Sequence, residues 1–123
     1  MLLRLVVAAQ GVFYLVTGIW PLVSLGTFEL VTGPKTDDWL VKTVGVLAGV
    51  IGIALISGAL RAAPSRETLV LAICAALAFA SVDIVFVLAG RIRAVYLADA
   101  AVEALFLLLA IIGAVKQRSS RSA

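Results

Sequence analysis

Three carboxylic acids, Asp83, Asp99 and Glu103, stand in stretches of the sequence that are otherwise apolar. An ionisable group in hydrocarbon costs about 2.5 kcal/mol or more, so it is expected to be paired, neutralised or turned toward a cavity. A carboxyl group that keeps its proton in such surroundings is a hydrogen-bond donor and a potential general acid. We therefore take these three acids as the candidate catalytic residues.

The spacing of these acids places them near one another. Tyr96, Asp99 and Glu103 follow at intervals of three and four, so they share one face of a helix. Asp83 is seven residues from Gly90 and Asp99 is six from Arg93, which puts both acids about 10 Å below the same boundary at 1.5 Å per residue. The sequence predicts that Asp83 and Asp99 are neighbours and that Glu103 lies one turn deeper.

Polar residues of the first two apolar stretches can complete a pocket around the acids. Gln10 and Tyr14 are four residues apart, and Tyr14 falls at a depth comparable with Glu103. Lys42, near the start of the second stretch, can extend outward or reach inward toward the acids. The candidate substrate-binding residues are therefore Tyr14, Gln10, Lys42 and Tyr96, in a pocket that opens to the extracytoplasmic side.

The same residues allow a purely structural interpretation. Buried carboxyl groups in membrane bundles also join helices by hydrogen bonds, here for example Asp83 to Tyr14 or Asp99 to Lys42. Gln10 can be a helix-contact residue, and Tyr96 can belong to the interfacial aromatic belt. Both interpretations stay open at this point.

The composition determines which elements must position these side chains. The 123 residues are 63% hydrophobic and 14% charged, with a mean hydropathy of +1.19. The apolar residues form four blocks, and each has the roughly 20 residues needed to cross a bilayer as a helix. The sequence predicts one all-α transmembrane domain over residues 1–123, an integral membrane four-helix bundle with spans at about 5–25, 39–60, 67–89 and 93–115.

The segments between the spans contain residues that are typical of turns and helix ends. Gly33-Pro34 indicates a turn in a loop of about a dozen residues, Ser65 is a plausible N-cap, and Gly90 permits a left-handed residue after the third span. We expect the first apolar block to be a retained span, because no cleavage pattern of small residues follows it. The basic tail, residues 116–123, is predicted to be disordered.

The basic residues predict the orientation. Six of the ten fall on the side that holds both termini and the connection between the second and third spans. Because Lys and Arg are enriched in cytoplasmic segments, both termini are predicted to be cytoplasmic, N-in and C-in. These six residues are Arg4, Arg61, Arg66, Lys116, Arg118 and Arg121.

Several function classes are disfavoured by the residues present. The net charge is +3, but the basic residues sit at the ends of apolar blocks, so no nucleic-acid partner is expected. The single cysteine, Cys74, has no partner for a disulfide, and the absence of histidine removes His-based catalysis and haem ligation. We expect neither a metal nor a cofactor.

A stripe of small residues, Gly45, Gly49 and Gly52, follows one side of the second span. Such a stripe lets two helix backbones approach closely. It predicts either packing within the bundle, which we favour, or a homo-oligomer formed through these glycines.

The opening segment LRLVVAAQGVFYLVTGIWPLV, with an arginine before the first span and glycines along it, resembles the first helix of the DoxX-like superfamily of small four-span bacterial proteins. The resemblance covers about a fifth of the chain. It implies a multi-pass protein of the bacterial inner membrane, and it does not fix a function.

Three functions compete on this basis. The first is a pocket for a membrane lipid or another hydrophobic or amphiphilic small molecule, which the acids bind or transform by acid chemistry. The second is a proton- or cation-coupled transporter, formed as an oligomer. The third is an accessory or assembly subunit without catalysis. Whether the protein is an enzyme stays open.

Overall fold

A computed structural model describes residues 1–122, with side chains through Arg121, and its regular structure is α-helical throughout. Each of its four long helices is long and apolar enough to cross a membrane. A helix of 22 residues is about 33 Å long, close to the thickness of a hydrocarbon core. These helices are α1 (Leu2–Val23), α3 (Asp38–Ala59), α4 (Arg66–Leu88) and α5 (Tyr96–Ser122). The all-helical prediction with four long apolar helices is confirmed.

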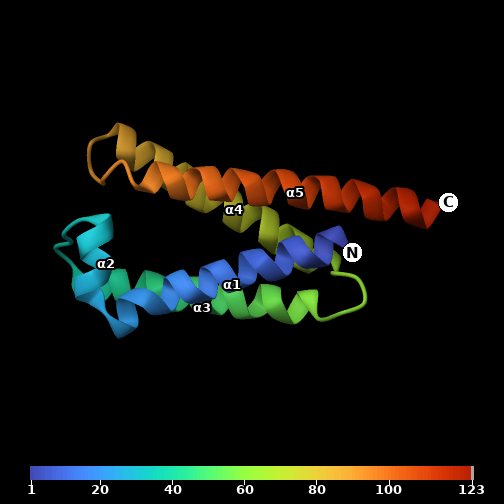
Figure 1. Ribbon diagram of the computed structural model, residues 1–123, viewed down its shortest axis with the longest axis horizontal. Helices are drawn as coiled ribbons and strands as arrows, with labels where there is room; N and C mark the ends of the chain where they lie inside the picture. The colour runs from blue at the N-terminus through green and yellow to red at the C-terminus, as the bar shows by residue number, and fades with distance from the viewer. Residues whose placement is uncertain (123) are drawn as a thin grey trace.

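The four helices form a bundle of two antiparallel pairs (Figure 1). Helix α1 packs against α3, α4 packs against α5, and α1 also contacts α5. Both termini and the connection between α3 and α4 lie at one end, which we call the terminal end. The short helix α2 (Leu25–Thr32) and the connection between α4 and α5 lie at the other end, which we call the α2 end.

The predicted glycine stripe packs within the chain. A Cβ atom added at Gly45 would lie 2.5 Å from the carbonyl oxygen of Gly18, and one added at Gly52 would lie 2.5 Å from that of Gly11. Both distances are too short for any side chain, so the backbones of α1 and α3 touch at these points. The contacts of Gly45 and Gly52 with α1 thus agree with the favoured interpretation, packing within the bundle.

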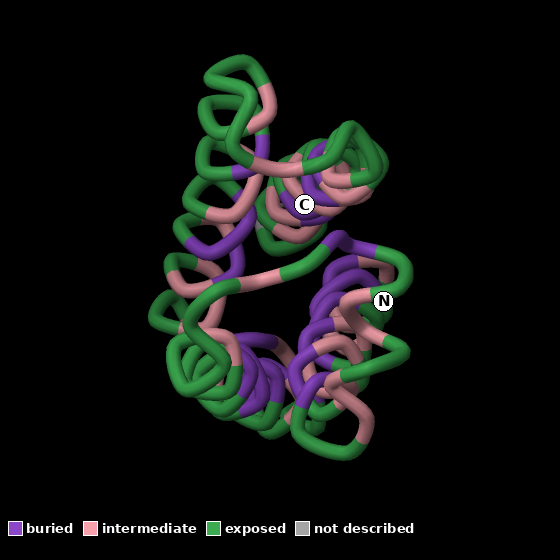
Figure 2. Tube along the Cα trace, turned by 90° about the vertical axis from the view of Figure 1, so that its left-hand side faces the viewer, coloured by how far each residue is buried: buried purple, intermediate pink, exposed green. Residues whose placement is uncertain are grey.

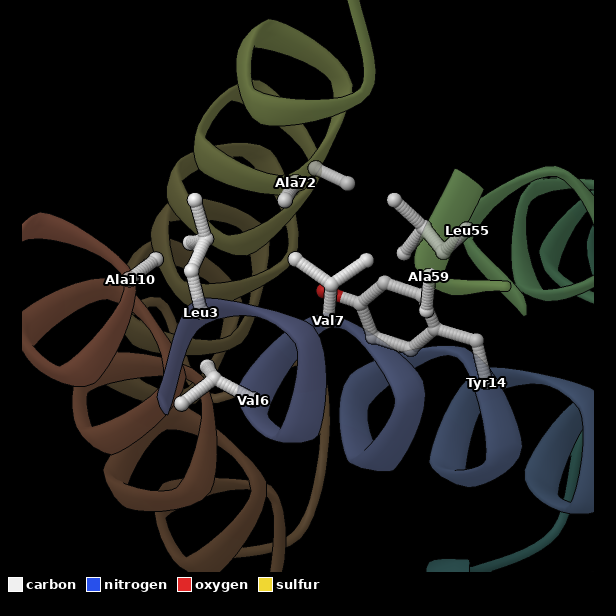
Figure 3. Packing of buried hydrophobic residues seen from close by; sticks show 9 residues of the cluster. Leu3, Val6, Val7, Tyr14, Leu55, Ala59, Ala72 and Ala110 are labelled. Atoms are coloured by element: carbon white, nitrogen blue, oxygen red, sulfur yellow. The ribbon is translucent and has the colours of Figure 1, made fainter. Parts of the chain in front are cut away.

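The buried core lies where α1 faces the other three helices. Figure 2 shows the buried residues along the inward sides of the helices. Leu3 and Val7 of α1 pack with Leu55 of α3, Ala72 of α4 and Ala110 of α5, as seen in Figure 3. The buried residues that α4 and α5 contribute to this cluster are alanines, and of these two helices α5 makes the more extensive contact with α1.

The α2 end differs from the predicted loop. The segment after α1 forms α2, whose N-cap Ser24 accepts a hydrogen bond from the backbone N–H of Thr27. Trp20 holds this helix to the end of α1, since its indole N–H donates to Thr27 and its ring packs edge-on against Phe28. Helix α2 ends at Thr32, and the C-cap residue Gly33 has a φ of 98°, in the left-handed region.

The other helix ends agree in part with the sequence signals. Ser65 caps α4 by accepting from Thr68 N–H, and Gly90 has a φ of 72° just beyond α4, as predicted. Helix α5 begins at Tyr96 and not at Arg93. It continues to Ser122, so residues 116–122 are helical where a disordered tail was predicted, and residue 123 lies outside the described residues. The basic and polar residues of this last segment continue the helical turns of the apolar span without an intervening Gly or Pro.

Candidate functional site

A hydrogen-bonded group of Gln10, Tyr14 and Glu103 lies in the middle of the bundle. The Tyr14 hydroxyl donates to Oε2 of Glu103 at 2.5 Å. The Gln10 side-chain amide donates both to the Tyr14 hydroxyl, at 3.0 Å, and to the Ala72 carbonyl oxygen, at 2.9 Å. All three side chains are almost fully buried. The group therefore joins α1 to both α4 and α5, and we call it the central network.

Aromatic rings surround the central network. The Tyr14 ring lies 5.1 Å from that of Phe79 on α4, and Phe13 lies 5.7 Å from Phe106 on α5, centre to centre. These are ordinary distances for favourable ring contacts. Around Tyr14 and Glu103 the interior is thus occupied by side chains, and the network holds three helices together.

The central network and the pair of acids nearer the α2 end each hold a buried oxygen without a hydrogen-bond partner among the described residues, Gln10 Oε1 in the network and Asp83 Oδ2 in the acid pair. The Asp83 carboxyl group is close enough to that of Asp99 for the two to share a hydrogen bond. Asp83 is only 5% exposed, yet its Oδ2 atom has no hydrogen-bond partner. The charged groups that act on Asp83 in the described chain are acids as well, Asp99 and Glu103. This acid pair can accept a proton or a positively charged group.

Residues at the end of α2 and in the following turn contact Tyr96, beside the acid pair. Tyr96, one turn from Asp99 toward the α2 end, lies within hydrogen-bonding reach of the Thr32 side chain and interacts with both acids. The Lys35 ammonium lies 5.4 Å from the centre of the Tyr96 ring and donates to Thr32 and Gly33. Burial lowers the pKa of Lys35, Glu29 opposes this shift, and Arg93 adds to it.

Arg93 holds the C-terminal end of α2. Its guanidinium group donates to the Leu30 carbonyl oxygen at 3.3 Å, near the C-terminus of α2, where a positive charge is favourable. Its side chain also packs against Gly33, where an added Cβ atom would lie 3.0 Å from Nε. Sequence reasoning missed Thr32, Lys35 and Arg93 as site residues. The N-cap signal at Ser24 could have revealed α2, and with it the contacts with Tyr96.

The structure groups some of the predicted site residues and separates others. Asp83, Asp99 and Tyr96 lie together, and Glu103 lies with Tyr14 and Gln10. The suggested hydrogen bond of Tyr14 to Asp83 is replaced by the bond to Glu103. Lys42 is exposed on α3, which packs mainly against α1, and it is not among the charged groups acting on Asp83.

Two open grooves lie away from the acids. One, of about 650 Å³, is at the terminal end between α1 and α5. The other, of about 590 Å³, runs along α1 and is lined by apolar residues such as Val12, Phe13 and Phe106. Neither groove is lined by Asp83, Asp99 or Glu103. Within the described residues, no three acidic or cysteine side chains are placed to hold a metal ion.

Comparison with known proteins gives no relative from which a function could be transferred. No protein-family model, no curated protein and no solved structure matches the chain. What the site can do is therefore argued from its own geometry.

Proposed function

We propose that this chain is a multi-pass membrane protein with both termini in the cytoplasm, and that Asp83 and Asp99 bind the polar end of an amphiphilic small molecule. Membrane insertion is supported by the outward faces of the bundle, which expose large apolar side chains along every long helix. A soluble protein rarely exposes apolar surface on this scale. Examples are Val16, Leu47, Val85 and Leu108, each about half exposed.

The orientation can be tested with single cysteines. Cys74 is replaced by alanine, and a cysteine is introduced by Thr36→Cys at the α2 end or by Ser120→Cys at the terminal end; both positions are exposed. A membrane-impermeant maleimide is expected to label Thr36→Cys in intact cells and Ser120→Cys only after permeabilisation. The reverse pattern would contradict the proposed orientation, and labelling of both in intact cells would contradict a span between them.

One observation carries the proposed binding function. The buried Asp83 has an oxygen without a hydrogen-bond partner, and the charged groups that act on it are acids. Buried polar atoms are nearly always partnered, so such an atom points to a missing partner. A protonated amine supplies both the hydrogen bond and the charge, and its alkyl chain suits the apolar surroundings. The acid pair is thus suited to bind a cationic amphiphile. Such binding needs only the two carboxyl groups and no chemical reaction.

The probe for this site is dodecylamine, with dodecanol as its uncharged match. Binding to the full chain in nanodiscs is expected for the amine. Asp83→Asn or Asp99→Asn should weaken it about tenfold or more, because a charge-assisted hydrogen bond contributes about 1.5–3 kcal/mol. Asp38→Asn, an exposed acid at the start of α3, is the matched control. Equal binding of amine and alcohol, or no loss in either variant, would refute the proposal.

A hydrophobic carbodiimide gives a second readout, since it adds to protonated carboxyl groups in apolar surroundings and leaves a stable acylurea. We expect the adduct at Asp83 or Asp99, and we expect it to decrease when dodecylamine is present. Labelling at these acids without protection by the amine would mean that they hold a proton and do not bind the ligand.

A proton-relay function is the alternative, because a line of polar groups continues from the acid pair through Glu103 and Tyr14 to Gln10. Proton uptake into proteoliposomes, driven by an imposed membrane potential and abolished by Asp83→Asn, would favour the relay. If Asp83→Asn left this proton uptake unchanged, binding would remain the better explanation of the acid pair.

A further inference from the structure

The groove at the terminal end combines an apolar wall with a basic rim. It lies between the first turns of α1 and the last turns of α5 (Figure 1). The two helices meet closely beneath it, since a Cβ atom added at Gly113 would lie 3.0 Å from the Cα atom of Leu3. Leu2, Leu3 and Leu5 line the α1 side of the groove. This wall is thus made of leucine side chains of α1.

The opposite side of the groove is polar and positively charged. It is formed by Lys116, Gln117, Ser120 and Arg121 of α5, and none of the residues that line the groove is acidic. Helix α1 starts at the same place without a side-chain cap, so the positive end of its dipole faces this region. Glu67, near the start of α4 at this end, is exposed and lies beside Arg61 and Arg66.

The length of α5 puts this basic rim at a specific depth. Its 27 residues make a helix of about 40 Å, longer than a hydrocarbon core of about 30 Å. The last turns of α5 extend past the start of α1 (Figure 1). If the apolar part of α5 spans a bilayer, Lys116 and Arg121 lie at the level of the phosphates, and the leucine wall lies at the level of the acyl chains.

We propose that this groove binds an anionic phospholipid, with its phosphate between Lys116 and Arg121 and one acyl chain along Leu2, Leu3 and Leu5. The inference rests on the proposed membrane insertion and orientation, and it is independent of the acid pair. Basic pockets between helices at a cytoplasmic surface are suited to anionic head groups. The apolar wall extends the contact to the lipid chain, which a free phosphate lacks.

The test is native mass spectrometry of the full chain, released from detergent with phosphatidylglycerol or phosphatidylcholine of the same acyl composition. We expect a retained phosphatidylglycerol, and a loss of about tenfold in its affinity in the double variant Lys116→Gln/Arg121→Gln. The matched control, Arg61→Gln/Arg66→Gln, removes the same charge from exposed positions at the same end but outside the groove. It should retain the lipid.

Three outcomes would overturn the proposal. Equal losses in the two double variants would mean that surface charge alone attracts the lipid. Equal retention of phosphatidylcholine would remove the role of the anionic head group. Displacement by glycerol phosphate would mean that the groove recognises a soluble phosphate and not a lipid.

A shape variant separates binding from folding. Ser120→Trp places a large side chain into the groove from an exposed position while leaving both basic residues in place. It is expected to reduce lipid retention without changing the labelling of Thr36→Cys in intact cells. Unchanged lipid retention in this variant would contradict binding inside the groove, whereas a changed labelling pattern would instead contradict the proposed membrane orientation.

Discussion

Replacing Gly52 by alanine is expected to destabilise the folded chain by about 3 kcal/mol, since overpacking a close contact costs about 1–3 kcal/mol or more. The added methyl group would lie 2.5 Å from the carbonyl oxygen of Gly11 and 2.7 Å from the backbone nitrogen of Leu15. Both are backbone atoms of α1, which cannot move away alone. The α1 and α3 helices must therefore separate along their whole contact.

Gly49 provides a control on the same helix. An added Cβ atom there meets only the end of the Leu15 side chain, at 3.8 Å. Gly49→Ala should be neutral or stabilise the fold by up to about 1 kcal/mol, because alanine has the higher helix propensity. The measurement is reversible unfolding of the full chain in dodecyl maltoside micelles titrated with dodecyl sulfate, followed by fluorescence of Trp20 and Trp39.

Gly45→Ala repeats the first test at the other end of the same contact, where the methyl group would lie 2.5 Å from the Gly18 carbonyl oxygen. If Gly45, Gly49 and Gly52 all tolerated alanine equally, the backbones of α1 and α3 could not be in contact as described. If alanine lowered the free energy of unfolding at Gly45 and Gly52 but not at Gly49, close backbone approach would be the cause, and not a general sensitivity of α3 to substitution.

Removing the Tyr14 hydroxyl group is expected to have the second largest effect. Tyr14→Phe leaves the buried Glu103 carboxyl without its donor and Gln10 with one acceptor fewer. An unpartnered buried polar group costs about 1–3 kcal/mol, so we expect a destabilisation in this range. Glu103→Gln keeps an oxygen that can accept from Tyr14 and should cost less.

Thr17→Val is the matched control for this prediction. The Thr17 hydroxyl donates to the Phe13 carbonyl oxygen within α1 and contacts no other helix by a hydrogen bond among the described residues. A double-mutant cycle of Tyr14→Phe with Glu103→Leu, which removes the acceptor, should give a coupling free energy of about 0.6 kcal/mol and no more than about 1.7 kcal/mol, the average and maximum between membrane helices. A coupling of zero, or equal effects of Tyr14→Phe and Thr17→Val, would contradict the central network.

The central network and the acid pair should also differ in function. Hydrogen bonds join Gln10, Tyr14 and Glu103 across three helices, although Gln10 Oε1 lacks a partner, whereas among the described residues no hydrogen bond joins Asp83 to α1. Glu103→Gln is therefore expected to change stability more than amine binding, and Asp83→Asn is expected to do the opposite. Acids that one sequence pattern treats alike thus have different expected roles.

Part of the site could be predicted from spacing alone. The shared face of Tyr96, Asp99 and Glu103 follows from helical periodicity, and the common depth of Tyr14 and Glu103 follows from the rise per residue. Which acid receives the Tyr14 hydrogen bond depends on how α1 is rotated against α4 and α5. Almost every face of these helices is apolar, so the sequence pattern does not specify that rotation.

The sequence by itself determined that the chain forms helices, how many of them are long and apolar enough to cross a membrane, and where several of them end. Local geometry suffices for this, because span length, periodicity and caps such as Ser65 and Gly90 act within a few residues. Only the tertiary structure decided that α1 pairs with α3 through glycines, that Lys42 is exposed on α3, and that Tyr14 bonds to Glu103. Those outcomes depend on contacts between segments far apart in the chain, where shape selects the partner and composition does not.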